Sequence, residues 1–180
     1  METVSSRPIY ENQWISVRED VVRRSDGTEA LYAVVDKSDF AIIIPRDGDR
    51  FHLVQQFRYP LRQRSWEFPG GSIPGARTFD PIAAATQELR EETGLRAEHL
   101  TYLGKIAPGP ATTSHFGHVV LATGLTEGPH EREPSEQDME AAWFSRAEFE
   151  AMIEQGRIID GQTVAAYTLL CLHERANPPR

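Results

Sequence analysis

Residues 80–94, DPIAAATQELREETG, have the pattern of one amphipathic helix with both ends marked. Asp80 can cap the first turn, and Pro81 suits the first helical position, where a missing N–H costs nothing. Gly94 is a typical residue at which a helix ends. The inward face is predicted to consist of three apolar residues: Ile82, Ala85 and Leu89.

Three acidic residues lie close together on the same predicted helix. At about 100° per residue, Glu88, Glu91 and Glu92 share an arc of about 100°. Their repulsion costs roughly a few tenths of a kcal/mol per pair, so a compensating charge is expected. A hard divalent cation such as Mg²⁺ or Mn²⁺ would supply that charge, because these ions bind several carboxylate oxygens at once. The alternative is a plain acidic face exposed to water.

Upstream of this helix the chain is rich in β structure. Asp26-Gly27 and Asp47-Gly48 each separate two strand-like runs, which predicts two hairpins or a meander. A short strand at 66–68 then leads into the Pro- and Gly-rich loop 69–75. The four upstream runs contain many β-branched and aromatic residues and cover 14–22, 31–35, 41–44 and 51–57.

Downstream of the helix, strands and helices both follow. Ser145 and Glu148 have the spacing of a capping box and open a helix that Gly156 ends. A last helix is predicted at about 162–175, and the acidic stretch 127–138 is predicted to be a loop. The predicted strands cover 100–107, 117–122 and 141–144. This order of elements predicts a mixed α+β fold.

Composition limits the class of protein. The chain has 180 residues, enough to bury a core, and its 39% apolar content excludes a disordered chain. The formal net charge of −8 argues against a nucleic-acid partner, because phosphate binding requires an excess of Lys and Arg. No apolar run approaches the roughly 18 residues of a membrane span, and the start, METVSSRPIY, lacks the apolar stretch of a signal peptide. With one cysteine, Cys171, the chain is expected to be cytoplasmic, with no membrane partner.

Two segments have a recognisable pattern: EFPGG at 67–71, which leads into the Pro- and Gly-rich loop, and ELREETGL at 88–95, on the predicted helix and just after it. Together they resemble the signature of the Nudix hydrolases, Gly-x5-Glu-x7-Arg-Glu-U-x-Glu-Glu-x-Gly-U, where U is apolar. Residues 55–60, QQFRYP, are similar to the segment before this signature in the ADP-ribose pyrophosphatase branch. The resemblance implies an α/β/α sandwich with a mixed central sheet and an N-terminal antiparallel β region. We expect residues 1–40 to form the N-terminal region and 41–180 the hydrolase domain.

The resemblance implies hydrolysis of a pyrophosphate bond assisted by divalent cations. Carried over by position, the Gly71 carbonyl and the carboxylates of Glu88, Glu91 and Glu92 would hold the metal, and Glu88 and Glu92 would also be catalytic. Metal ions neutralise phosphate charge and lower the pKa of a bound water. Paired glycines would let the backbone approach the metals closely. The alternative for this glycine pair is a plain turn.

The chain departs from the signature at two positions. Gln87 stands where the signature has arginine. Phe79 occupies the counted position of the first signature glutamate, after a loop two residues longer than the pattern. Arg90 and Arg77 are the candidates to replace the missing positive charge.

Other residues bear on the substrate. By resemblance, Arg58 helps to bind the diphosphate, which suits a planar bidentate donor. Trp14 and Tyr32 fall near positions where dimeric relatives place aromatic side chains around the adenine. Pro110 lies fifteen residues beyond Leu95, a mark of the ADP-ribose-cleaving branch. The alternative for Arg58 is a surface arginine without a role in binding. The alternative for Trp14 and Tyr32 is a place in the hydrophobic core.

An additional acid near the last strand often acts as base in this branch, and Glu136 is the first candidate here. The expected function is metal-dependent hydrolysis of ADP-ribose or a related nucleoside diphosphate sugar, giving AMP and ribose 5-phosphate from ADP-ribose. Alternatives are another substrate, such as GDP-mannose, a dinucleoside polyphosphate or an oxidised nucleoside triphosphate, and a nucleotide-sugar sensor with weak catalysis. The resemblance also implies Mg²⁺ or Mn²⁺ as cofactor and a homodimer with a shared site.

Overall fold

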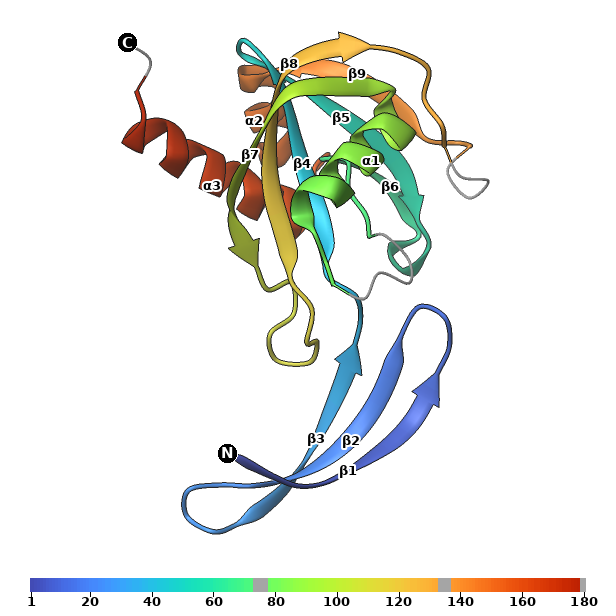
Figure 1. Cartoon of the computed structure of the whole chain (residues 1–180), viewed down its shortest axis with the longest axis vertical. Coiled ribbons are helices and arrows are strands. Elements are labelled where there is room, and N and C mark those ends of the chain that lie inside the picture. Colours follow the sequence, from blue (N-terminus) through green and yellow to red (C-terminus); the bar gives the residue numbers. More distant parts are fainter. Residues whose placement is uncertain (73–77, 133–136, 179–180) are drawn as a thin grey trace. The chain divides into compact units, whose positions relative to one another are not determined.

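A computed structural model describes residues 1–72, 78–132 and 137–178. The chain divides into two compact units (Figure 1). The first unit comprises Met1–Asp39 and Ala107–Phe116, and the second comprises Phe40–Ile106 and Gly117–Arg180. Within the described residues, no helix is both long enough and apolar enough to cross a membrane.

The first unit contains a three-stranded antiparallel sheet in the order β1-β2-β3. The predicted Asp-Gly turn joins β2 to β3: Gly27 adopts φ +83°, and the Asp26 carboxylate accepts the Thr28 N–H at 3.0 Å. Strand β1 was not expected, because its side chains are exposed along its whole length and it lacks an apolar alternation. Strand β2 begins at Ser16, so Trp14 lies outside it. The strands are β1 (Glu2–Glu11), β2 (Ser16–Arg23) and β3 (Glu29–Asp36).

The second unit contains a mixed six-stranded sheet. Its order is β6-β5-β4-β8-β7, and β9 pairs with β5. Strands β4 and β8 are parallel, whereas the other neighbours are antiparallel. A 3-10 helix, Tyr59–Leu61, joins β5 to β6. The strands are β4 (Phe40–Asp47), β5 (Arg50–Arg58), β6 (Gln63–Glu67), β7 (Leu95–Ile106), β8 (Gly117–Glu127) and β9 (Glu140–Ser145).

Helices cover both faces of this sheet (Figure 1). Successive side chains of a strand point to opposite faces, so Ala41 and Ile43 pack with α1 (Pro81–Thr93). Ile42 and Ile44 pack instead with α2 (Arg146–Glu154) and α3 (Gly161–Ala176). All four are buried, as expected for a strand covered on both faces. The predicted α/β/α sandwich with a mixed central sheet is confirmed.

The ends of α1 are as predicted. The Asp80 carboxylate accepts the N–H groups of Ile82 and Ala83, and Gly94 ends the helix with φ +73°. Ala85 and Leu89 are buried, but Ile82 is 38% exposed, so its predicted inward position is wrong. The buried arc comprises Ala84, Ala85, Glu88, Leu89 and Glu92, and therefore includes two of the three acids.

The capping box of α2 is also confirmed, with Ser145 and Glu148 bonding to each other's backbone. Gly156, at φ +69°, follows this helix as predicted. The two faces of the sheet therefore differ in chemistry. The α2 and α3 face is a large apolar core with Phe51, Phe149 and Leu170 fully buried, whereas the α1 face combines apolar packing with buried carboxylates.

Candidate active site

The chain after β6 is held against β4 by backbone hydrogen bonds. The Ile43 N–H donates to the Pro69 carbonyl at 2.9 Å, and the Ala41 N–H donates to the Gly71 carbonyl at 2.8 Å. A Cβ at Gly70 would lie 2.2 Å from the Ala41 carbonyl oxygen, which no side chain could accept without moving the backbone. The glycine pair therefore does more than form a turn, since it allows this segment to run directly along the strand.

Two carboxylates of α1 meet these glycines. A Cβ at Gly71 would lie 2.6 to 2.8 Å from the carboxylate atoms of Glu88. The Gly70 N–H donates to Glu92 Oε2 at 3.0 Å. Glu88 is 8% exposed and Glu92 only 2%. The structure thus brings together Gly71, Glu88 and Glu92, at the cost of burying two acids that need compensating interactions.

Glu91 is more accessible than Glu88 and Glu92. Its contacts show what Gln87 does at the position where the signature has arginine. The Gln87 Nε2 group donates to both carboxylate oxygens of Glu91, at 3.0 and 3.3 Å. Gln87 therefore orients this carboxylate by hydrogen bonding, although it adds no charge. Arg90 Nη2 lies 3.8 Å from Glu91 Oε1 and supplies a nearby positive charge. Arg77, the other candidate for that charge, lies outside the described residues.

The donor atoms of this cluster suit a hard divalent cation. They are carboxylate oxygens beside a backbone carbonyl, the ligands that Mg²⁺ and Mn²⁺ prefer. The Gly71 carbonyl already accepts one N–H, but a carbonyl oxygen has a second lone pair. The space that a Cβ at Gly71 would fill is occupied by the Glu88 carboxylate, so this carboxylate lies directly against the Gly71 backbone. Across 1–72, 78–132 and 137–178, no group of three or more His, Cys, Asp or Glu side chains is gathered as a ready metal site.

Arg58 is paired with a buried acid on the neighbouring strand. Its Nη2 lies 2.8 Å from Glu67 Oε2, and its Nε also donates to that oxygen. The Glu67 side chain is 5% exposed, whereas that of Arg58 is 44% exposed. Burial raises the pKa of Glu67, and the Arg58 guanidinium opposes this effect. Glu67 therefore fixes one end of Arg58 while leaving part of the guanidinium accessible.

The other substrate candidates belong to the first unit. Trp14 lies in the turn after β1 and is 66% exposed, and Tyr32 of β3 is 39% exposed, so neither is a core residue. The Asn12 side chain shapes the turn by accepting the N–H of Trp14 at 2.8 Å. The Tyr32 hydroxyl donates to the Ala111 carbonyl at 3.0 Å, directly after the exposed Pro110.

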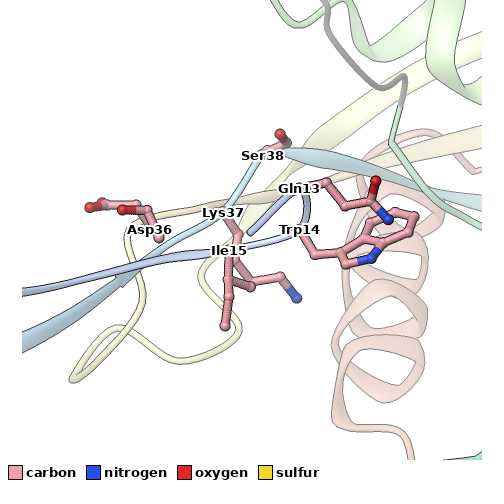
Figure 2. Close-up of a pocket in the computed structure, with 7 residues that line it drawn as sticks. Gln13, Trp14, Ile15, Asp36, Lys37 and Ser38 are labelled. Carbon is pink, nitrogen blue, oxygen red and sulfur yellow. The ribbon is translucent and has the colours of Figure 1, made fainter. Parts of the chain in front are cut away.

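A shallow pocket of about 260 Å³ lies beside Trp14. Figure 2 shows Trp14 and Gln13 extending to one side of the chain and Asp36 to the other. Asp36 forms an ion pair with Arg18, which lowers the pKa of the Asp36 carboxyl. The pocket is lined by Gln13, Trp14, Ile15, Ser16, Asp36, Lys37 and Ser38.

The predicted base, Glu136, lies outside the described residues. Sequence reasoning also missed Arg132, whose guanidinium donates to the backbone carbonyls of Glu92 and Met139. Forty positions separate Arg132 from Glu92, and no spacing pattern connects them. Phe79 stands in place of the first signature glutamate, and its ring packs 4.9 Å from that of His118, so it is a packing residue.

The fold and the buried glutamates beside a glycine pair together define a Nudix-type hydrolase domain. Comparison with known proteins agrees: residues 36–167 match the NUDIX domain, and residues 1–35 match the nucleoside diphosphate sugar hydrolase N-terminal domain. The chain belongs to the Nudix family.

Individual relatives cover nearly the whole chain. An ADP-ribose pyrophosphatase of Mycobacterium tuberculosis is 32% identical over 96% of this chain and 83% of its own length. A methanol dehydrogenase activator of Bacillus methanolicus is 26% identical over 96% of this chain and 94% of its own length. A crystal structure of an ADP compounds hydrolase has a TM-score of 0.85 at 18% identity, covering 98% of this chain and 95% of that one. This last likeness shows that the fold is shared.

Proposed function

We propose that this chain hydrolyses the pyrophosphate bond of ADP-ribose or a related nucleoside diphosphate sugar, yielding AMP and ribose 5-phosphate from ADP-ribose. The observation that carries the proposal is the pair of buried carboxylates, Glu88 and Glu92, held against Gly70 and Gly71. The similarity to an ADP-ribose pyrophosphatase and to the N-terminal domain of nucleoside diphosphate sugar hydrolases supports this substrate class.

The proposed cofactor is Mg²⁺ or Mn²⁺, held by the Gly71 carbonyl and by Glu88, Glu91 and Glu92. When bound, such an ion neutralises phosphate charge and acidifies a bound water. Glu88 and Glu92 are the proposed catalytic carboxylates. Glu136 is proposed as an additional carboxylate that acts as general base and accepts the proton of the attacking water. Gln87 donates two hydrogen bonds to the Glu91 carboxylate and so orients it for metal binding.

Substrate recognition is assigned to Arg58 and to residues of the first unit. Arg58, fixed by Glu67 but partly exposed, can donate to the diphosphate through its remaining N–H groups. Trp14 and Tyr32 are proposed to stack on the adenine, and their exposure supports this role. Pro110 precedes Ala111, whose carbonyl accepts the Tyr32 hydroxyl, and is also proposed to contact the substrate.

We also propose a homodimer that forms through residues 1–40, with residues 41–180 as the hydrolase domain. The three-stranded sheet of the first unit is too small to bury a core of its own. Strand β1 is exposed throughout, and exposed apolar side chains include Val4, Ile9, Tyr10 and Leu31. Light scattering coupled to size-exclusion chromatography should give twice the 20.3 kDa mass of the chain. A monomer at micromolar concentration would contradict this.

We further propose that the protein acts in the cytoplasm. Cys171, the one cysteine of the chain, is a free thiol. This agrees with a reducing compartment, where disulfides are rare.

A panel of nucleoside diphosphate compounds, assayed with Mg²⁺ and with Mn²⁺, tests the function. ADP-ribose should be cleaved with the highest kcat/KM, and AMP should appear with ribose 5-phosphate in equal amounts. GDP-mannose, a dinucleoside polyphosphate and an oxidised nucleoside triphosphate represent the other substrates. Tight binding of ADP-ribose without turnover of any compound would show a nucleotide-sugar sensor instead.

A further inference from the structure

The last turn of α1 is capped by a distant part of the chain. Helices leave their final carbonyl groups without partners inside the helix. Here three of these groups accept hydrogen bonds from residues 128–132, the segment that follows β8. The bonds run from the Gly128 N–H to the Gly94 carbonyl (2.9 Å), from the Glu131 N–H to the Glu91 carbonyl (3.0 Å) and from Arg132 Nε to the Glu92 carbonyl (3.0 Å).

The fit between the segment and the helix end is close. A Cβ at Gly94 would lie 2.4 Å from the Gly128 carbonyl oxygen, and Gly94 has φ +73°. Glycine is therefore required here both for the backbone conformation and for the approach of the segment. Arg96 adds a second guanidinium at this end, since it donates to the carbonyls of Gly94 and Pro129.

Arg132 connects this cap to the residue that precedes β9. Its Nη1 donates to the Met139 carbonyl, directly before β9, while its Nε donates to the Glu92 carbonyl. The Gln137 side chain in turn donates to the Arg132 carbonyl at 3.0 Å. A planar guanidinium can hold two acceptors in a fixed arrangement, which a lysine ammonium cannot reproduce. Arg132 thus connects the end of α1 to the start of β9.

Two of the three capped carbonyls belong to acidic residues, Glu91 and Glu92. Glu91 and Glu92 lie in the final turn, the part of a helix that frays when its carbonyls lack partners. We propose that Arg132 is a positioning residue, which fixes the last turn of α1 through the Glu92 carbonyl and so places the carboxylates of Glu91 and Glu92. This inference rests on the proposed function, in which those carboxylates hold the metal.

The proposal also explains how the chain manages without the signature arginine. Gln87 supplies hydrogen bonds to Glu91 but no charge. Arg132 supplies a positive charge and a restraint from outside the signature, at the end of the helix where the dipole is negative. The two hydrogen bonds of the Arg132 guanidinium go to backbone carbonyls and not to the carboxylates.

The test compares Arg132→Gln with Arg157→Ala, a control at an exposed arginine outside the site. Hydrogen exchange of the metal-free protein should be about tenfold faster at the amides of residues 91–94 in Arg132→Gln, with the amides of α3 unchanged. Mn²⁺ binding, followed by the electron paramagnetic resonance of free Mn²⁺, should weaken about tenfold, as for other residues that orient metal ligands. Arg157→Ala should match the wild type in both measurements.

Several outcomes would overturn the proposal. They are unchanged exchange in the last turn, unchanged Mn²⁺ affinity, or faster exchange of equal size throughout α1 and α3, which would indicate general destabilisation. Arg132→Lys keeps the charge but not the bridge, so full recovery in this variant would also overturn it. Neither measurement uses a nucleotide. A wild-type protein that fails to cleave ADP-ribose would therefore contradict the proposed function without deciding the role of Arg132.

Discussion

At the scale of single residues, Gln87 shows how a missing charge can be replaced by geometry. Its amide donates to both oxygens of Glu91, one helical turn away. Because the carboxylate is already oriented, Gln87→Arg should change kcat by less than about threefold. Gln87→Ala removes both hydrogen bonds and should lower kcat about tenfold. As a control for stability, the melting temperatures of both variants should lie within about 2 °C of the wild-type value. A large gain in Gln87→Arg would show instead that the absent arginine limits catalysis.

At the scale of elements, the pair Arg58 and Glu67 connects β5 to β6. Removing Arg58 leaves the buried Glu67 carboxylate without its charged partner, so the pKa of Glu67, already raised by burial, should rise further. Arg58→Ala should destabilise the protein at pH 7 by roughly 1–2 kcal/mol, less than for a fully buried pair. When the pKa of a group is higher in the folded than in the unfolded state, the group contributes to the free energy of unfolding at low pH, and this contribution is lost as pH rises through the pKa of the folded state. The deficit should therefore shrink between pH 7 and pH 5.

Urea unfolding at both pH values measures this deficit. The matched control is the double variant Arg58→Ala with Glu67→Gln, which has no titrating group at this position and should show no such pH dependence. A deficit of equal size at both pH values in Arg58→Ala would mean that Glu67 does not feel the loss of the arginine.

His52 of β5 should make the stability of the protein depend on pH. It is 8% exposed, and its ring packs edge-on against Trp143 of β9 at 4.8 Å. Burial, together with the charge of Arg132, lowers the pKa of His52 to about 4. The unfolded chain therefore binds a proton more readily between pH 6.5 and about 4, and stability must fall as pH falls through this window. His52→Gln should flatten this loss in urea unfolding, and an unchanged slope would contradict the assignment.

The elements that sequence predicts are those with local causes. The Asp80 cap and the Asp26-Gly27 turn depend on contacts within a few residues, and both are present. Strand β1 has no such signal, because its pairing with β2 comes from backbone bonds that any sequence can make. The acidic signature likewise locates Glu88 and Glu92, but the contact of Arg132 with α1 depends on how two distant segments pack.

At the scale of the whole molecule, the formal charge of −8 comes from two segments of the sequence. Glu88, Glu91 and Glu92 contribute −3, and residues 127–140, with six acids and Arg132, contribute −5. The rest of the chain is neutral. Residues 128–132 of the second segment lie against the end of the helix that carries the three glutamates. The free energy of unfolding should therefore respond strongly to cations that bind here.

Mg²⁺ should raise the melting temperature of the protein well beyond the effect of salt alone. A ligand at 100 times its dissociation constant adds about 2.7 kcal/mol to the free energy of unfolding, or roughly 5–10 °C for a chain of this size. NaCl at equal ionic strength only screens the carboxylates and should give a much smaller shift. Glu91→Gln should keep or slightly raise the melting temperature of the metal-free protein, since it relieves like-charge repulsion, yet lose most of the Mg²⁺ shift. Differential scanning calorimetry of both proteins measures these shifts. An equal Mg²⁺ shift in the variant would mean that the cations bind elsewhere on the acidic surface.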